Sequence, residues 1–115
     1  MPSKMPKPCD EARERFDEVI DHLMVERDVV RAPLFGMPAA KVVGGKAFVG
    51  MFGDGIVAKL GGDDHAAALA LDGAGLFDPM GGRPMREWVV IPFAHADTWD
   101  AYVRAAESYV RSVSA

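Results

Sequence analysis

The sequence contains neither asparagine nor glutamine, and its hydroxyl side chains are few. Bidentate reading of adenine in the DNA major groove uses the amide side chains of these two missing residues. Their absence therefore argues against base-specific recognition of DNA. Polar recognition by this chain has to rely on backbone groups, charged side chains or water.

Cysteine is nearly as scarce, because Cys9 is the only one in 115 residues. An internal disulfide is excluded, and a reducing compartment is the expected setting. No apolar run approaches the roughly 20 residues that cross a bilayer, and the Pro-rich start lacks the apolar core of a signal peptide. We therefore expect a cytoplasmic protein that does not bind membranes.

Positive charge is not in excess either, since the formal net charge is −4 and the isoelectric point is about 5.3. Such a chain has no overall attraction to nucleic acid, so any basic site must be local. Acidic residues gather between Asp10 and Asp28, where they are typical of a solvated helix face. Basic residues gather at Lys41 to Lys59 and around Arg83 and Arg86, where an anion would bind first.

Half of the residues are apolar, which suffices for one modest core. We expect a flexible Pro-rich segment over residues 1–9 and a single domain over residues 10–115. Apolar residues then recur with helical spacing from Phe16 to Met24, which predicts an amphipathic helix from Asp10, as its N-cap, to about Arg27.

Three extended runs follow, at residues 40–43, 47–52 and 56–60, and glycines separate them. Gly44 and Gly45 suit a tight hairpin turn that needs positive φ. The pattern predicts an antiparallel meander of three strands. A helix capped by Asp63 or Asp64, a strand over residues 87–92 and a closing helix capped by Asp97 complete the order.

This order predicts an α+β fold in which an antiparallel sheet of about four to five strands carries helices mainly on one face. The opposite face would then be bare. A bare face, or an edge strand, favours a homodimer.

Residues 77–89 interrupt the surrounding pattern with two prolines, paired glycines, arginines and bulky apolar side chains. We expect a packed connection between a helix and the last strand, anchored by Phe77, Met80, Met85 and Trp88. The segment also holds the best candidate for ligand binding, because consecutive glycine amides and arginines bind carboxylates or phosphates. The candidate residues are Gly81, Gly82, Arg83 and Arg86.

No catalytic or metal-binding pattern stands out. Gly44-Gly45-Lys46 lacks the spacing and the following helix of a phosphate loop. Asp63, Asp64 and nearby His65 are explained better by a helix start than by a metal. Neither Cys9 nor the serines of the last segment have the surroundings of a nucleophile. We expect no enzyme activity, no metal and no cofactor.

The motif order resembles that of the TfoX N-terminal domain family, small proteins related to the bacterial competence regulator TfoX/Sxy. The likeness spans almost the whole chain: the leading helix, then the motifs at residues 34–37, 43–48, 52–60 and 88–92 ahead of a closing helix. The resemblance implies a fold akin to secretion chaperones and a regulatory or protein-interaction role. It supplies no catalytic residues to carry over, and no protein partner is identified.

The related MmcQ/YjbR group is a weaker match and gives the alternative. In that interpretation the chain is an anion- or nucleic-acid-binding domain. The local basic patch would consist of Arg83, Arg86, Lys41 and Lys59.

Overall fold

The structure, a computed structural model, describes residues 7–114. Most of the flexible segment expected at residues 1–9 lies outside this range; within it, the backbone N–H of Cys9 donates to Asp54 Oδ1 (2.6 Å). Between residues 7 and 114, no helix is both long and apolar enough to cross a membrane. The elements are α1 (Asp10–Glu26), β1 (Val29–Arg31), β2 (Ala39–Val42), β3 (Ala47–Phe52), β4 (Gly55–Lys59), α2 (Gly62–Leu69), β5 (Gly75–Phe77), β6 (Met85–Ile91), η1 (Phe93–Thr98, a 3₁₀ helix) and α3 (Trp99–Ser114).

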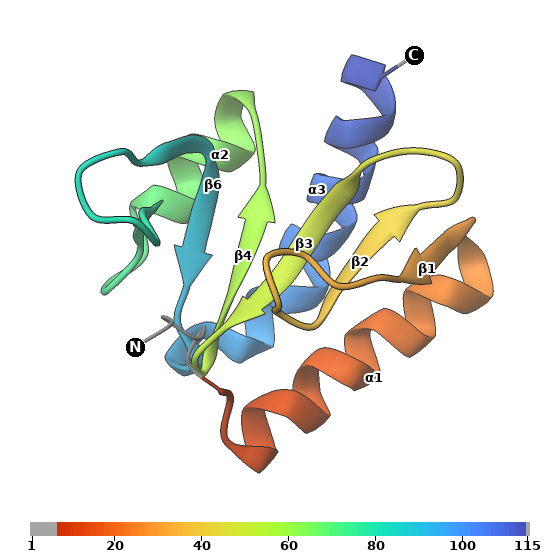
Figure 1. Ribbon diagram of the computed structural model, residues 1–115, viewed down its shortest axis with the longest axis horizontal. Helices are drawn as coiled ribbons and strands as arrows, with labels where there is room; N and C mark the ends of the chain where they lie inside the picture. Colours follow the sequence, from red (N-terminus) through yellow and green to blue (C-terminus); the bar gives the residue numbers. More distant parts are fainter. Residues whose placement is uncertain (1–6, 115) are drawn as a thin grey trace.

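The strands form one antiparallel sheet in the order β1-β2-β3-β4-β6-β5 (Figure 1). The α+β class and the meander of β2, β3 and β4 are confirmed. The expected number of four to five strands was too low, because the sheet has six. The two additional strands, β1 and β5, have three residues each, which is too short to show an alternating pattern.

The three described helices contribute to one apolar core against one face of the sheet, as expected (Figure 1). Strand residues such as Ile56, Ala58 and Ile91 point into this core. The helical members include Phe16, Ile20 and Leu23 of α1, Ala68 of α2, and Trp99, Val103 and Val110 of α3.

The helices do not start at the expected aspartate caps. The N-cap positions of α1 and α2 are Cys9 and Gly61, and neither makes a side-chain capping hydrogen bond. Asp10 and Asp63 lie in the first turn instead, where a carboxylate still favours the positive end of the helix dipole. Asp97 lies within η1, so α3 begins later than predicted, at Trp99.

The hairpin between β2 and β3 contains the predicted glycine turn and a bulge. Gly44 has positive φ (73°). Ala40 pairs with Val49 while Lys41 pairs with Ala47, so Phe48 is an extra residue in β3. The bulge lets the consecutive Phe48 and Val49 both enter the helix-side core.

The other face of the sheet, here called the helix-free face, is not bare as we expected. It carries a second apolar cluster of four buried residues, Met37, Val57, Phe77 and Trp88. Leu34 packs against this cluster from the turn between β1 and β2. A face with this much apolar surface has to be covered, and here the cover is a turn and a hairpin instead of helices.

Residues 77–89 belong to a β-hairpin formed by β5 and β6, and are not a connection from a helix to a strand. Phe77 ends β5 and Met85 begins β6, with a loop over residues 78–84. Phe77 and Trp88 are buried anchors as predicted, and the ring of Phe77 meets that of Phe52 edge-on at 5.1 Å. Met80 is no anchor, because it lies in the loop and its side chain is 83% exposed.

We predict that Trp88→Ala lowers the free energy of unfolding by about 3–5 kcal/mol, because it leaves a cavity in the second cluster. Met80→Ala is the matched control from the same hairpin and should be nearly neutral. Urea unfolding followed by circular dichroism measures both variants. An unchanged midpoint for Trp88→Ala would contradict its role as an anchor.

Candidate functional site

The predicted glycine amides lie in the loop between β5 and β6, together with an internal carboxylate. Asp78 accepts hydrogen bonds from the backbone N–H groups of Gly82 (2.9 Å, to Oδ2) and Arg83 (3.2 Å, to Oδ1). Gly81 and Gly82 both have positive φ, 72° and 107°. Two successive backbone amides therefore converge on one carboxylate, but they are those of Gly82 and Arg83, while the N–H of Gly81 donates to the backbone carbonyl of Asp78 (3.4 Å).

The structure brings Gly81, Gly82 and Arg83 into this loop and places Arg86 on β6. Both arginines are exposed, and none of the ion pairs within residues 7–114 involves either of them. The carbonyl of Arg86 lies 2.6 Å from Nε2 of His65, which links the start of α2 to β6. Anion binding by these residues stays a prediction.

The other two basic residues of the predicted patch lie on the helix-free face. Lys41 is paired in register with Ala47, and Lys59 with Trp88, and both partners pack in the second apolar cluster. Lys41 and Lys59 are on β2 and β4, which are separated by β3, so they are about 10 Å apart across the sheet.

Lys59 is part of a small polar cluster at the end of the sheet. Its Nζ lies 3.8 Å from Glu87 Oε1, and Tyr109 of α3 donates its hydroxyl hydrogen bond to Glu87 Oε2. This hydrogen bond raises the pKa of Tyr109. The contact therefore stabilises the fold below the pKa of a free tyrosine and is lost as the pH rises through the raised pKa.

A groove of about 320 Å³ opens where α1 meets the connection between β1 and β2. Its wall includes Phe16 of α1 and Met37 of the connection, which are both buried. Arg13 and Arg31 are its charged lining residues. Sequence reasoning missed this groove, since its walls are distant in sequence and the motif at residues 34–37, which contributes Gly36 and Met37, carries no ligand-binding signal.

The groove is bordered by a tight turn over residues 34–37. Two backbone hydrogen bonds close this turn, from Leu34 N–H to Met37 O (3.1 Å) and from Met37 N–H to Leu34 O (2.8 Å). Both central residues have positive φ, 51° at Phe35 and 80° at Gly36. Asparagine and glycine are the usual residues of such turns, so a phenylalanine there is strained. Its side chain is nonetheless 57% exposed.

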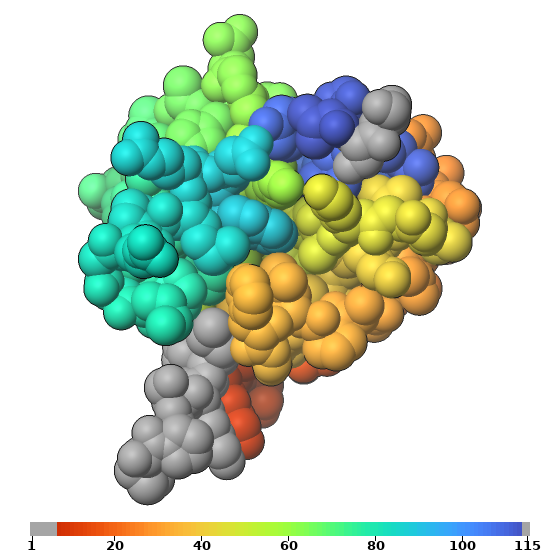
Figure 2. Space-filling view, turned by 45° about the horizontal axis from the view of Figure 1, so that its top comes forward, coloured from red at the N-terminus to blue at the C-terminus, as the bar shows by residue number. Residues whose placement is uncertain are grey.

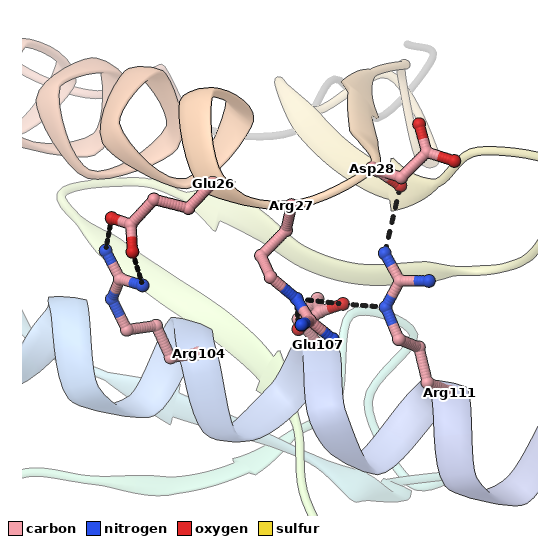
Figure 3. A network of polar contacts seen from close by, with 6 residues as sticks. All are labelled: Glu26, Arg27, Asp28, Arg104, Glu107 and Arg111. Carbon is pink, nitrogen blue, oxygen red and sulfur yellow. Dashed lines mark hydrogen bonds and ion pairs between the residues drawn. The ribbon is translucent and has the colours of Figure 1, made fainter.

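A network of ion pairs joins the end of α1 to α3 (Figure 3). Its centre is Glu107, which is 2% exposed and lies between Arg27 (Nε to Oε1, 3.2 Å) and Arg111. Arg111 Nη2 also donates to the carbonyl of Asp28 (3.1 Å). The sequence offered no signal for this network beyond charges on two amphipathic helices, because the partners from α1 and α3 are 80 positions apart.

A more exposed pair lies one turn away in the same network (Figure 3). Arg104 donates two hydrogen bonds to Glu26, at 2.9 and 3.2 Å, and one from Nε to Asp100 at 3.0 Å. The hydrogen bond from Arg104 lowers the pKa of Glu26. Its stabilising effect is present above the ordinary glutamate pKa and is lost as the pH falls through the lowered pKa.

Residues with catalytic or metal-binding potential are scattered. Within the part of the chain that the structure describes, no group of three His, Cys, Asp or Glu side chains is arranged to hold a metal. Cys9 is exposed. Ser112 donates to the carbonyl of Tyr109 on its own helix (2.8 Å), and Ser108 is exposed on the same helix. His95 Nε2 lies 2.7 Å from the carbonyl of Asp72.

We predict that Glu107→Gln lowers the free energy of unfolding by about 1–2 kcal/mol. Loss of a buried ionic partner usually costs more, but here both arginines are partly exposed and water can solvate them. Glu26→Gln, in the exposed pair, is the control and should have the smaller effect. Thermal unfolding at neutral pH measures both, and a wild-type midpoint for Glu107→Gln would argue against the network.

Comparisons of the chain with models of protein families, with curated protein sequences and with solved structures found no match. The TfoX N-terminal resemblance therefore stays a prediction that follows from the order of the sequence motifs.

Proposed function

We propose that this chain is a cytoplasmic, non-enzymatic protein-interaction module of the TfoX N-terminal type, akin to secretion chaperones, and that the helix-free face is its binding surface. The observation that carries the proposal is Phe35, a large exposed apolar side chain held in strained backbone, in the turn that supplies Leu34 and Met37 to this face. Packing does not explain a strained and exposed phenylalanine, whereas a partner would cover it.

A second exposed apolar side chain supports the proposal. Met80 projects from the loop of the β5–β6 hairpin, and the hydrogen bonds of Asp78 hold that loop in shape. Figure 2 shows the turn around Phe35 in orange beside the hairpin in teal. The second apolar cluster lies beneath these two segments. The face therefore combines buried apolar packing with the exposed side chains of Phe35 and Met80.

The first partner to consider is a second copy of the chain. In a symmetric dimer the same patch faces itself, so each Phe35 would meet the helix-free face of the other copy. The apolar part of the face has to form the centre of such an interface, because burying charged groups opposite their own copies is unfavourable. Lys41 and Lys59 would then lie at the rim of the interface.

We predict opposite effects of Phe35→Asn on stability and on association. Asn-Gly is the favoured pair in this turn, so the free energy of unfolding should rise by about 1 kcal/mol. Loss of the phenylalanine ring should weaken dimerisation about tenfold. Chemical unfolding and sedimentation over a micromolar concentration series measure the two effects.

Val25→Asn is the matched control, because Val25 is an apolar residue of α1 that is 87% exposed. It should leave association unchanged. A strictly monomeric mass of the wild-type chain at every concentration would refute self-association. Equal weakening by both substitutions would refute the specific role of Phe35.

The second candidate function is binding of anions or nucleic acid. The observation that favours it is that Lys41 and Lys59 lie on one face of the sheet. Arg83 and Arg86 would extend this patch from the adjacent hairpin.

We predict that any binding of labelled single-stranded DNA weakens steeply with salt, since phosphate contacts release counterions. Arg83→Ala and Arg86→Ala should each reduce the salt slope by about 1 without changing the fold. Fluorescence anisotropy over a salt series measures the slope. Absence of binding at low salt would exclude this candidate.

A further inference from the structure

We propose that the groove between α1 and the β1–β2 connection binds a small organic monoanion, with an apolar body inside the groove and a carboxylate against Arg13 and Arg31. This site goes beyond the proposed function, because its lining combines Arg13 and Phe16 of α1 with residues of the β1–β2 connection; it shares Met37 with the second apolar cluster.

The size and the lining of the groove set the class of ligand. A volume of about 320 Å³ lies at the lower end of the range for small-molecule sites. It suits a ligand of about a dozen non-hydrogen atoms. The lining is mainly apolar, with Phe16, Met37, Pro33 and Pro38 among its members. Such walls favour an aryl or alkyl body over a sugar or inorganic phosphate.

The charges of the groove set the sign of the ligand. Arg13 and Arg31 are the charged lining residues, and they share the carboxylate of Asp17. The distances are 3.1 Å from Arg13 Nε to Oδ2 and 3.1 Å from Arg31 Nη2 to Oδ1. Asp17 shows how a carboxylate fits between the two guanidinium groups, and it is the group with which a ligand has to compete.

Arg13 keeps donors for a ligand. The hydrogen bonds of its side chain within residues 7–114 run through Nε alone. The two terminal nitrogens form the other edge of the guanidinium group, and that edge matches a carboxylate with two parallel hydrogen bonds. Arg31 is more fully engaged, because Nη1 also contacts Asp21 at 3.0 Å. Arg13 is therefore the principal anchor, and Arg31 contributes charge.

The walls of the groove are already in place. Pro33 and Pro38 fix φ on either side of the turn, and the turn is closed by the two hydrogen bonds between Leu34 and Met37. On the opposite side, Phe16 is held in the main core. Binding of a ligand therefore costs little conformational entropy for ordering the site.

Titration of the ¹⁵N-labelled chain with 4-phenylbutyrate tests the proposal. Saturable shifts are expected at the amides of Ala32, Gly36 and Ala39, which line the groove. The neutral 4-phenylbutyramide has the same body without the charge and should bind about tenfold more weakly. Inorganic phosphate has charge without the body and should not produce these shifts.

Two substitutions at the guanidinium pair should change the affinity for 4-phenylbutyrate in opposite directions. Arg13→Gln should weaken binding of 4-phenylbutyrate about tenfold, because it removes the principal anchor. Asp17→Asn should strengthen binding about fivefold, because it removes the competing carboxylate. Lys46→Gln is the matched control, because it removes an exposed positive charge outside the groove lining, and it should bind as the wild type does. Well-dispersed spectra show that each variant is folded.

Three outcomes would overturn the proposal: no saturable shifts in the groove, equal affinity for the amide and the carboxylate, or wild-type affinity in Arg13→Gln. None of them bears on the interaction function, since that is measured by sedimentation and by the effect of Phe35→Asn. A wild-type chain that is monomeric at every concentration and still binds 4-phenylbutyrate would refute only the interaction function.

Discussion

The central strands bury apolar side chains on both of their faces, and the rest of the molecule is arranged around this constraint. In β4, Ile56 and Ala58 point to the helices while Val57 points the other way. In β6, Val89 points to the helices and Trp88 to the helix-free face. Two faces of apolar surface need two covers, because exposed apolar area is unfavourable in water. The three helices of the described chain cover only one face.

The second cover is made from segments that have little core of their own, so it depends on local hydrogen bonds. Met37 is brought over the sheet by a turn with two backbone hydrogen bonds, and this geometry forces Phe35 into positive φ. Phe77 is brought there by a hairpin whose loop is held by Asp78. In both segments local hydrogen bonds fix the backbone, while one apolar side chain, Phe35 or Met80, stays exposed. This combination is the basis on which we propose the helix-free face as a binding surface.

The sequence predicted those parts of the fold whose signals are local and periodic. Helix α1 follows from the spacing between Phe16 and Met24, and the meander follows from three apolar runs separated by glycine. The short edge strand β5 left no such signal, and Met80 was assigned to the core because its apolar character says nothing about whether a neighbour covers it. The position of Glu107 between two arginines depends on how α1 and α3 pack, so no local pattern reveals it.

The groove also depends on how distant elements pack, so no local pattern in the sequence reveals it. The contacts that hold α1 in place explain why the groove is well formed. Helix α1 is held near its start, where Cys9 binds Asp54 and Arg15 Nε donates to the carbonyl of Ala96 (3.0 Å). It is held at its end by the ion pair of Arg27 with Glu107. Arg13 and Phe16 lie between these attachments. The wall of the groove is therefore fixed by contacts from three distant parts of the chain, and a ligand would meet a surface that the fold has already shaped.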